Sequence, residues 1–170
     1  MVPAEATAGV EGTAVAGSSS VLAGGEVGLH LTRSIAIGGS GFTLLRRVRV
    51  PGGAGGPTAL GFSYGGAFVE YRRPMPGEDE EDGRAVSARL LVGAANTDLV
   101  RAGTGADLGA ENVFVTHPAL GADLPLMSWL SSSIRAGYRW STEVNDLPGV
   151  GAGALRGPTI SVGLRLIHTP

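Results

Sequence analysis

The chain of 170 residues has no cysteine and no lysine. Without cysteine it can form no disulfide, no zinc site built on thiolates and no cysteine nucleophile. Without lysine it cannot form a phosphate-binding loop of the Walker A type, which requires that residue beside its glycines. All 13 basic residues are therefore arginines, and a formal net charge of −2 gives the sequence no basic footprint for a nucleic acid.

Charged residues and long apolar runs are also scarce. Charged residues make up 16% of the chain, against about 25% in ordinary soluble domains. No run of about 18 apolar residues exists, which excludes a membrane-spanning helix. The first residues, Met1–Glu5, contain neither a basic nor an apolar region, so we expect no signal peptide. The length is that of one domain.

Glycine, by contrast, is abundant, and its 29 residues lie inside the apolar segments. The dominant hydrophobic period of these segments is two residues, which indicates β-strands. In Thr159–Ile167, for example, one face is aliphatic and the other holds Ser161, Gly163 and Arg165. No segment has a convincing helical pattern, because the helix candidates are interrupted by glycine or proline.

The alternating segments predict eight strands. Their expected ranges are 5–16, 20–32, 34–49, 58–72, 84–97, 111–126, 131–145 and 157–168. Strands that follow one another with only turns and loops between them predict an all-β fold, an antiparallel up-and-down meander closed into a barrel of about eight strands. We expect residues 21–170 to form the barrel domain. The Ala/Gly-rich N-terminal segment 1–20 is either the first strand or a strand exchanged with another subunit.

Each strand has one aliphatic face and one face of small or charged residues. Small residues suit the crowded interior of a narrow barrel, so we expect the aliphatic face to point outward, toward lipid or a partner. The residues expected on the outer face include Leu29, Leu90, Tyr138 and Leu164. The same interpretation, applied to 60–69, places Leu60, Phe62, Tyr64 and Phe68 outside as well.

The charged residues of the second face predict a polar network in the lumen. Its expected members are Glu26, His30, Arg89, His117, Asp123, Arg135, Arg139 and Arg165. Because an unpaired buried charge is costly, we expect the arginines to pair with Glu26 and Asp123. We assign this network a structural role.

The connections between the strands tend to alternate in length. Thr32–Ser34 and Met127–Leu130 are short. The longer ones are Pro51–Pro57, Pro74–Arg84, Arg101–Ala110 and Asp146–Arg156. Membrane barrels of the up-and-down type have short turns on one rim and long loops on the other, and the sequence predicts the same asymmetry.

Three features that resemble reactive or metal sites have simpler interpretations. Gly61–Gly65 matches G-x-S-x-G, but a nucleophile elbow needs a helix after the serine and none follows. His30, His117 and His168 lack a metal-ligand spacing, although His30 and His117 both fit the inner face. The acidic run Glu78–Asp82 lacks the alternating ligands and glycine of a calcium loop and fits a solvated loop tip. We therefore expect no catalytic, cofactor or metal site, and no enzyme.

Several segments carry a resemblance to a known group of proteins. Gly137–Trp140, Asp146–Gly149 and Leu155–Leu166 together resemble the last hairpin of small bacterial outer-membrane β-barrel proteins. Arg33–Gly39 followed by Leu60–Tyr71 looks like the middle hairpins of the same group. The resemblance extends over Val21–Ile167. It implies no cofactor and transfers no site residues, because the group shares no active site.

These observations leave three functions open. The first is a non-enzymatic cell-envelope β-barrel with a structural or adhesive role in the outer membrane, in contact with a lipid bilayer. The second is a secreted barrel that self-assembles into an extracellular fibre, tube or surface layer, so that neighbouring copies cover its apolar face. Only nine aromatic residues and the ending Ile167–Pro170 favour this second function. The third, a lipocalin-type carrier, requires an apolar interior.

Overall fold

All the regular elements of the protein are β-strands. The computed structural model describes residues 3–50, 56–75, 84–145, 147–151 and 153–168. The strands are β1 (Ala4–Val15), β2 (Ser18–His30), β3 (Ile35–Leu44), β4 (Val48–Val50), β5 (Thr58–Pro74), β6 (Ala85–Arg101), β7 (Asp107–Met127), β8 (Leu130–Ser141) and β9 (Gly157–His168). Within these ranges, no helix is long and apolar enough to cross a bilayer.

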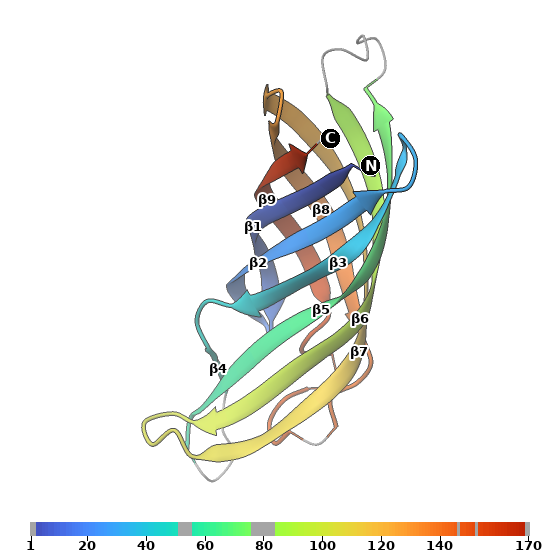
Figure 1. Ribbon diagram of the computed structural model, residues 1–170. Coiled ribbons are helices and arrows are strands. Elements are labelled where there is room, and N and C mark those ends of the chain that lie inside the picture. Colours follow the sequence, from blue (N-terminus) through green and yellow to red (C-terminus); the bar gives the residue numbers. More distant parts are fainter. Residues whose placement is uncertain (1–2, 51–55, 76–83, 146, 152, 169–170) are drawn as a thin grey trace.

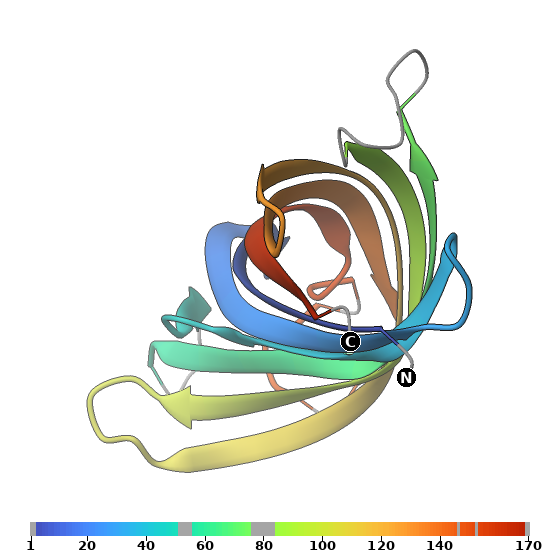
Figure 2. The ribbon, with the colours of Figure 1, turned by 45° about the horizontal axis from the view of Figure 1, so that its top comes forward.

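The strands form one closed antiparallel wall. Their order is β3-β2-β1-β9-β8-β7-β6-β5-β4, and the additional pairing of β3 with β5 closes the barrel. The short β4 prolongs β3 and pairs with the start of β5, so eight strands form the wall and one extra strand extends it. Figure 2 shows the wall curving around a central axis. The predicted eight-stranded meander is confirmed, and β1 lies between β2 and β9.

The strands are strongly tilted. The backbone N–H of His30 donates a hydrogen bond to the carbonyl of Pro3, the residue before β1. The path of paired residues then runs through Ala36, Glu70, Arg89, Ala119, Gly137 and Thr159, and it reaches Thr13. One circuit of the wall therefore ends about ten residues further along β1, a stagger that tilts the strands by roughly 35–45°.

We call the rim at which β1 begins and β9 ends the near rim, and the opposite one the far rim (Figure 1). The near rim carries the connections 31–34, 75–84 and 128–129, and the far rim carries 16–17, 45–57, 102–106 and 142–156. The predicted separation of short turns from long loops is therefore wrong at two connections. Connection 75–84, which contains the acidic run Glu78–Asp82, belongs to the near rim, although the run itself lies outside the described residues. The first far-rim turn is only Ala16 and Gly17.

Three strands extend beyond the rest at the far rim. β5 and β6 have 17 residues each and β7 has 21, against 10 to 13 in β1, β2, β3, β8 and β9. The hairpin of β6 and β7 projects past the neighbouring strands in Figure 1. The expected loop 101–110 is too long, because the ladder continues across a bulge to the pair Val100↔Asp107. A turn of five residues, 102–106, then suffices.

The outer surface is apolar over most of the wall. Leu29, Leu90, Tyr138 and Leu164 are between 38% and 52% exposed, which confirms that these four side chains point outward. The apolar surface ends toward the far rim. There the Asn96 amide donates a hydrogen bond to the Asn112 side chain on the outer face, and Asp98 pairs with Arg47.

The interior changes character along the axis, and this corrects one of our predictions. Leu60, Phe62, Tyr64 and Phe68 are at most 4% exposed and point inward. The far half of the lumen is an apolar core that includes Val15, Leu22, Phe42, Leu60, Leu99, Val113 and Val115. The expectation that bulky apolar residues lie outside fails for this core, whose outer wall carries polar residues such as Asn96 and Asp98, and it also fails for Phe68, whose ring lies against Arg89 in the near half.

Two inward aromatic rings explain two of the glycines. A Cβ atom at Gly24 would lie 2.6 Å from the Phe42 ring and 2.1 Å from the Gly41 carbonyl oxygen, and one at Gly38 would lie 2.7 Å from the Phe68 ring. No side chain fits at either position without displacing the ring. The Phe42 and Phe68 rings therefore occupy the space in the lumen that side chains at Gly24 and Gly38 would need.

Candidate functional site: the lumen network

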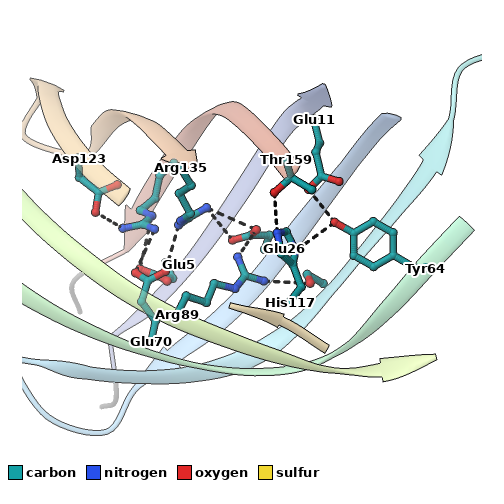
Figure 3. A network of polar contacts seen from close by, with 12 residues as sticks. Glu5, Glu11, Glu26, Tyr64, Glu70, Arg89, His117, Asp123, Arg135 and Thr159 are labelled. Atoms are coloured by element: carbon teal, nitrogen blue, oxygen red, sulfur yellow. Dashed lines mark hydrogen bonds and ion pairs between the residues drawn. The ribbon is translucent and has the colours of Figure 1, made fainter. Parts of the chain in front are cut away.

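Charged side chains fill the near half of the lumen (Figure 3). We call this group the charged cluster. Its members are Glu5, Glu26, Glu70, Arg72, Arg89, Asp123, Arg135 and Arg165. They come from β1, β2, β5, β6, β7, β8 and β9, so the cluster connects seven of the eight wall strands. Four carboxylates face four guanidinium groups, which makes the cluster neutral.

Glu70 contacts three arginines of the charged cluster. Its Oε1 lies 2.6 Å from Arg72 Nη2 and 3.2 Å from Arg165 Nη2, and its Oε2 lies 3.1 Å from Arg135 Nη2. The side chains of Glu70 and Arg165 are only 1% exposed. Arg165 also pairs with Asp123 at 2.7 Å. A buried charge is tolerable only when geometry of this kind replaces the water it has lost.

Glu26 lies between two arginines at the middle of the barrel. Arg89 donates to one carboxylate oxygen, and Arg135 lies 3.3 Å from the other. Arg89 also donates to the Ser40 hydroxyl at 2.9 Å, and its guanidinium carbon lies 4.0 Å from the centre of the Phe68 ring. Ser40 belongs to β3, so this contact ties the remaining wall strand to the network. The arginine is thus fixed by a charge, a hydroxyl and a ring.

One histidine contacts the near end of the charged cluster. His30 Nε2 lies 2.9 Å from Glu5 Oε2, the same oxygen that Arg72 contacts at 3.1 Å. The His30 and Arg72 side chains are each 15% exposed, more than the remaining members of the charged cluster. These two side chains are therefore the part of the network that is partly accessible to solvent at the near rim.

A second group, which we call the middle cluster, separates the charges from the apolar core. It consists of Glu11, Tyr64, His117, Arg139 and Thr159. Tyr64 donates to Glu11 at 2.6 Å, and His117 lies 3.3 Å from the Tyr64 hydroxyl and 2.7 Å from the Thr159 hydroxyl. Arg139 pairs with Glu11 at 3.2 Å and is fully buried. Every one of these side chains therefore has a polar partner.

The 142–156 connection closes the far end of the lumen. Its Val144, Leu147, Val150 and Leu155 are buried in the apolar core. The backbone carbonyl of Leu155 accepts a hydrogen bond of 2.8 Å from Arg139 Nε. The side chains of this connection therefore fill the far opening of the barrel, and the hydrogen bond from Arg139 anchors the connection to the middle cluster.

The residues of the features that resemble reactive or metal sites lie apart from one another in the structure. Ser63 of the G-x-S-x-G match lies within β5 beside Asn96 and Thr43 of the neighbouring strands, on the face opposite the inward Tyr64. Alternation of side chains along a strand puts the wall between Ser63 and His117. Across the described ranges, no group of three or more His, Asp and Glu side chains is arranged to hold a metal ion.

The structure places the sequence-derived residues as follows. Arg89 and Arg135 contact Glu26, Arg165 contacts Asp123, and Arg139 contacts Glu11. His30 and His117 belong to separate parts of the lumen, bound to Glu5 and to Tyr64 and Thr159 respectively.

Sequence reasoning missed further members of the network. They are Glu5, Glu11, Tyr64, Glu70, Arg72 and Thr159. Glu70 and Arg72 share the face of Phe68, so placing that ring outside moved them outside too. The alternation in β1, which puts Glu5, Thr7 and Glu11 on one face, was the signal that could have identified the two glutamates.

Comparisons with known proteins agree with this architecture. No family model and no curated protein sequence matches the chain. Among solved structures, Neisserial surface protein A matches with a TM-score of 0.69 at 12% identity, over 97% of this chain and 96% of that one. The N-terminal barrel of Pseudomonas aeruginosa OprF gives 0.60 at 11%, over 98% and 97%, and Yersinia pestis Ail gives 0.56 at 10%, over 98% and 99%. The chain has the fold of the small eight-stranded outer-membrane barrels.

Proposed function

We propose that the protein is a non-enzymatic β-barrel of a bacterial outer membrane with a structural or adhesive role. The observation that carries this proposal is the polarity of the near half of the wall. Ion pairs fill the inside and exposed aliphatic side chains cover the outside, the reverse of a barrel that is stable in water. A bilayer is the surrounding that such a surface requires.

The dimensions of the wall suit a bilayer. β8 and β9 each have 12 residues, and tilted strands of about 9–11 residues are long enough to span the hydrocarbon region. Aromatic side chains occur toward both edges of the apolar surface, with Tyr71 and Trp129 toward the near rim and Phe114 and Trp140 toward the far rim. Aromatic residues at two levels are typical of the interfaces of membrane barrels.

The filled lumen supports a structural role over a transport role. The charged cluster is formally neutral, each of its carboxylates pairs with at least one arginine, and the 142–156 connection fills the far mouth. A barrel of eight strands is narrow enough for such side chains to fill it. A lipocalin-type cavity is disfavoured for the same reason, because the apolar part of the lumen is occupied by the protein itself.

The adhesive alternative rests on the far rim. β5, β6 and β7 continue past the apolar surface, and the outer faces of β6 and β7 there carry Asp98 and Asp107. Strands that stand above a bilayer in this way offer a rigid surface to a partner outside the cell.

Refolding of the full chain from urea tests the proposal. We expect circular dichroism of β-structure and protection from protease when lipid vesicles are present, and aggregation in plain buffer. Leu164→Arg, in the middle of the apolar surface, should block insertion, whereas Asn112→Arg, beyond its edge, should not. A folded, soluble monomer in buffer contradicts the proposal, and ordered polymers in buffer would instead support the self-assembling secreted barrel.

A further inference from the structure

A groove lies on the outside of the far rim. It has a volume of about 530 Å³ and is lined by Ser18–Val21 and by Leu45–Arg49. The first segment follows the β1–β2 turn, and the second joins β3 to β4. The backbone N–H of Leu45 donates a 3.0 Å hydrogen bond to the carbonyl of Val21, which holds the two segments together. Three arginines line the groove, and among its serines Ser19 alternates onto the same outward face as Val21.

Two of these arginines are available to a ligand. Arg47 pairs with the Asp98 carboxylate. Arg46 and Arg49 are exposed, and within the described part of the chain neither makes a side-chain hydrogen bond or an ion pair. The groove therefore carries an excess of positive charge.

The groove is also amphipathic. Val21 and Leu45 are 48% and 59% exposed at the far edge of the apolar surface, and the arginines follow directly after Leu45. A ligand that fills the groove meets aliphatic side chains at one end and guanidinium groups at the other. A free anion would leave the aliphatic end of the groove without a contact, and an uncharged lipid would leave the guanidinium groups without a partner.

We propose that this groove binds the phosphate of a membrane lipid whose acyl chains lie against Val21 and Leu45. Guanidinium groups match phosphate oxygens with two parallel hydrogen bonds, and the Ser19 hydroxyl, on the face of Val21, supplies a further donor. The inference rests on the proposed membrane location, since only there do acyl chains reach the apolar end. It gives the far rim a fixed lipid contact at the level where the hydrocarbon ends.

Native mass spectrometry of the full chain, folded in dodecyl maltoside micelles, tests the site. The probes are phosphatidic acid, phosphatidylcholine and inorganic phosphate. We expect one retained phosphatidic acid per barrel, with at least about tenfold weaker binding in the Arg46→Gln/Arg49→Gln variant. The matched control, Arg33→Gln/Arg73→Gln, removes the same charge from exposed near-rim positions and should change the affinity less than about twofold.

Three outcomes overturn the proposal. Equal weakening in the two double variants means that net charge alone attracts the lipid. Displacement of the lipid by inorganic phosphate at similar concentration means that the acyl chains contribute nothing. A folded barrel that retains no phosphatidic acid removes the site but leaves the proposed membrane function intact, whereas a chain that stays unfolded in micelles, as seen by circular dichroism, contradicts both.

Discussion

The Tyr64 hydroxyl donates a 2.6 Å hydrogen bond to Glu11 across the lumen, from β5 to β1. The Tyr64 ring also stacks on Phe42 and Phe62, with centroids 5.5 and 5.8 Å away. One side chain therefore belongs to both halves of the interior. Its hydroxyl completes the polar part, and its ring begins the apolar core.

Removal of that hydroxyl tests the boundary. Tyr64→Phe keeps the ring packing but leaves Glu11 with Arg139 as its remaining partner. Because a hydrogen bond to a charged group contributes about 1.5–3 kcal/mol, the free energy of unfolding should fall by that amount. Urea titration in detergent measures it. Tyr138→Phe on the outer face is the control, and an equal effect of both variants would remove the boundary role.

The charged cluster predicts a larger effect at Arg165. Arg165→Met leaves Asp123 and Glu70 each with one partner fewer in a site where all three side chains are nearly inaccessible. Loss of one member of a buried ion pair costs about 3–5 kcal/mol, so the same titration should show a loss of that size. Arg33→Met, at an exposed position, should change stability by less than about 0.5 kcal/mol. Similar values for the two variants would mean that the cluster does not stabilise the fold.

The glycines that face the inward aromatic rings give a third prediction. Gly24→Ala forces its new methyl group against the Phe42 ring and the Gly41 carbonyl, and should destabilise the protein by about 1–3 kcal/mol. Gly39→Ala is the matched control, because the nearest atom to its added Cβ lies 3.8 Å away. Thermal or urea unfolding of the two variants in detergent compares them directly. If Gly24→Ala is the more stable variant, the ring does not occupy the position described.

Much of this architecture could be predicted from alternation alone, and the exceptions have physical causes. In β8 and β9 small or charged residues alternate with aliphatic ones, so the two faces are plain in the sequence. In β5 the inward Leu60, Phe62 and Phe68 look like an outer face, because alternation gives the period but not which face is inside. The same inward face of β5 continues from these residues to Glu70 and Arg72, so the character of the face changes along the strand while its direction does not. Two of the partners of Glu70, Arg135 and Arg165, lie on distant strands, and no local pattern predicts them.

The central claim is that the exposed aliphatic surface lies against lipid, and labelling at Leu90 tests it most directly. Because the chain has no cysteine, Leu90→Cys and Asn112→Cys each give one site for a nitroxide label. In vesicles we predict that oxygen dissolved in the hydrocarbon enhances the relaxation of the label at position 90 and that a water-soluble nickel complex does not. The label at position 112 should show the opposite accessibility. A nickel-accessible label at position 90 in the folded barrel would contradict the account.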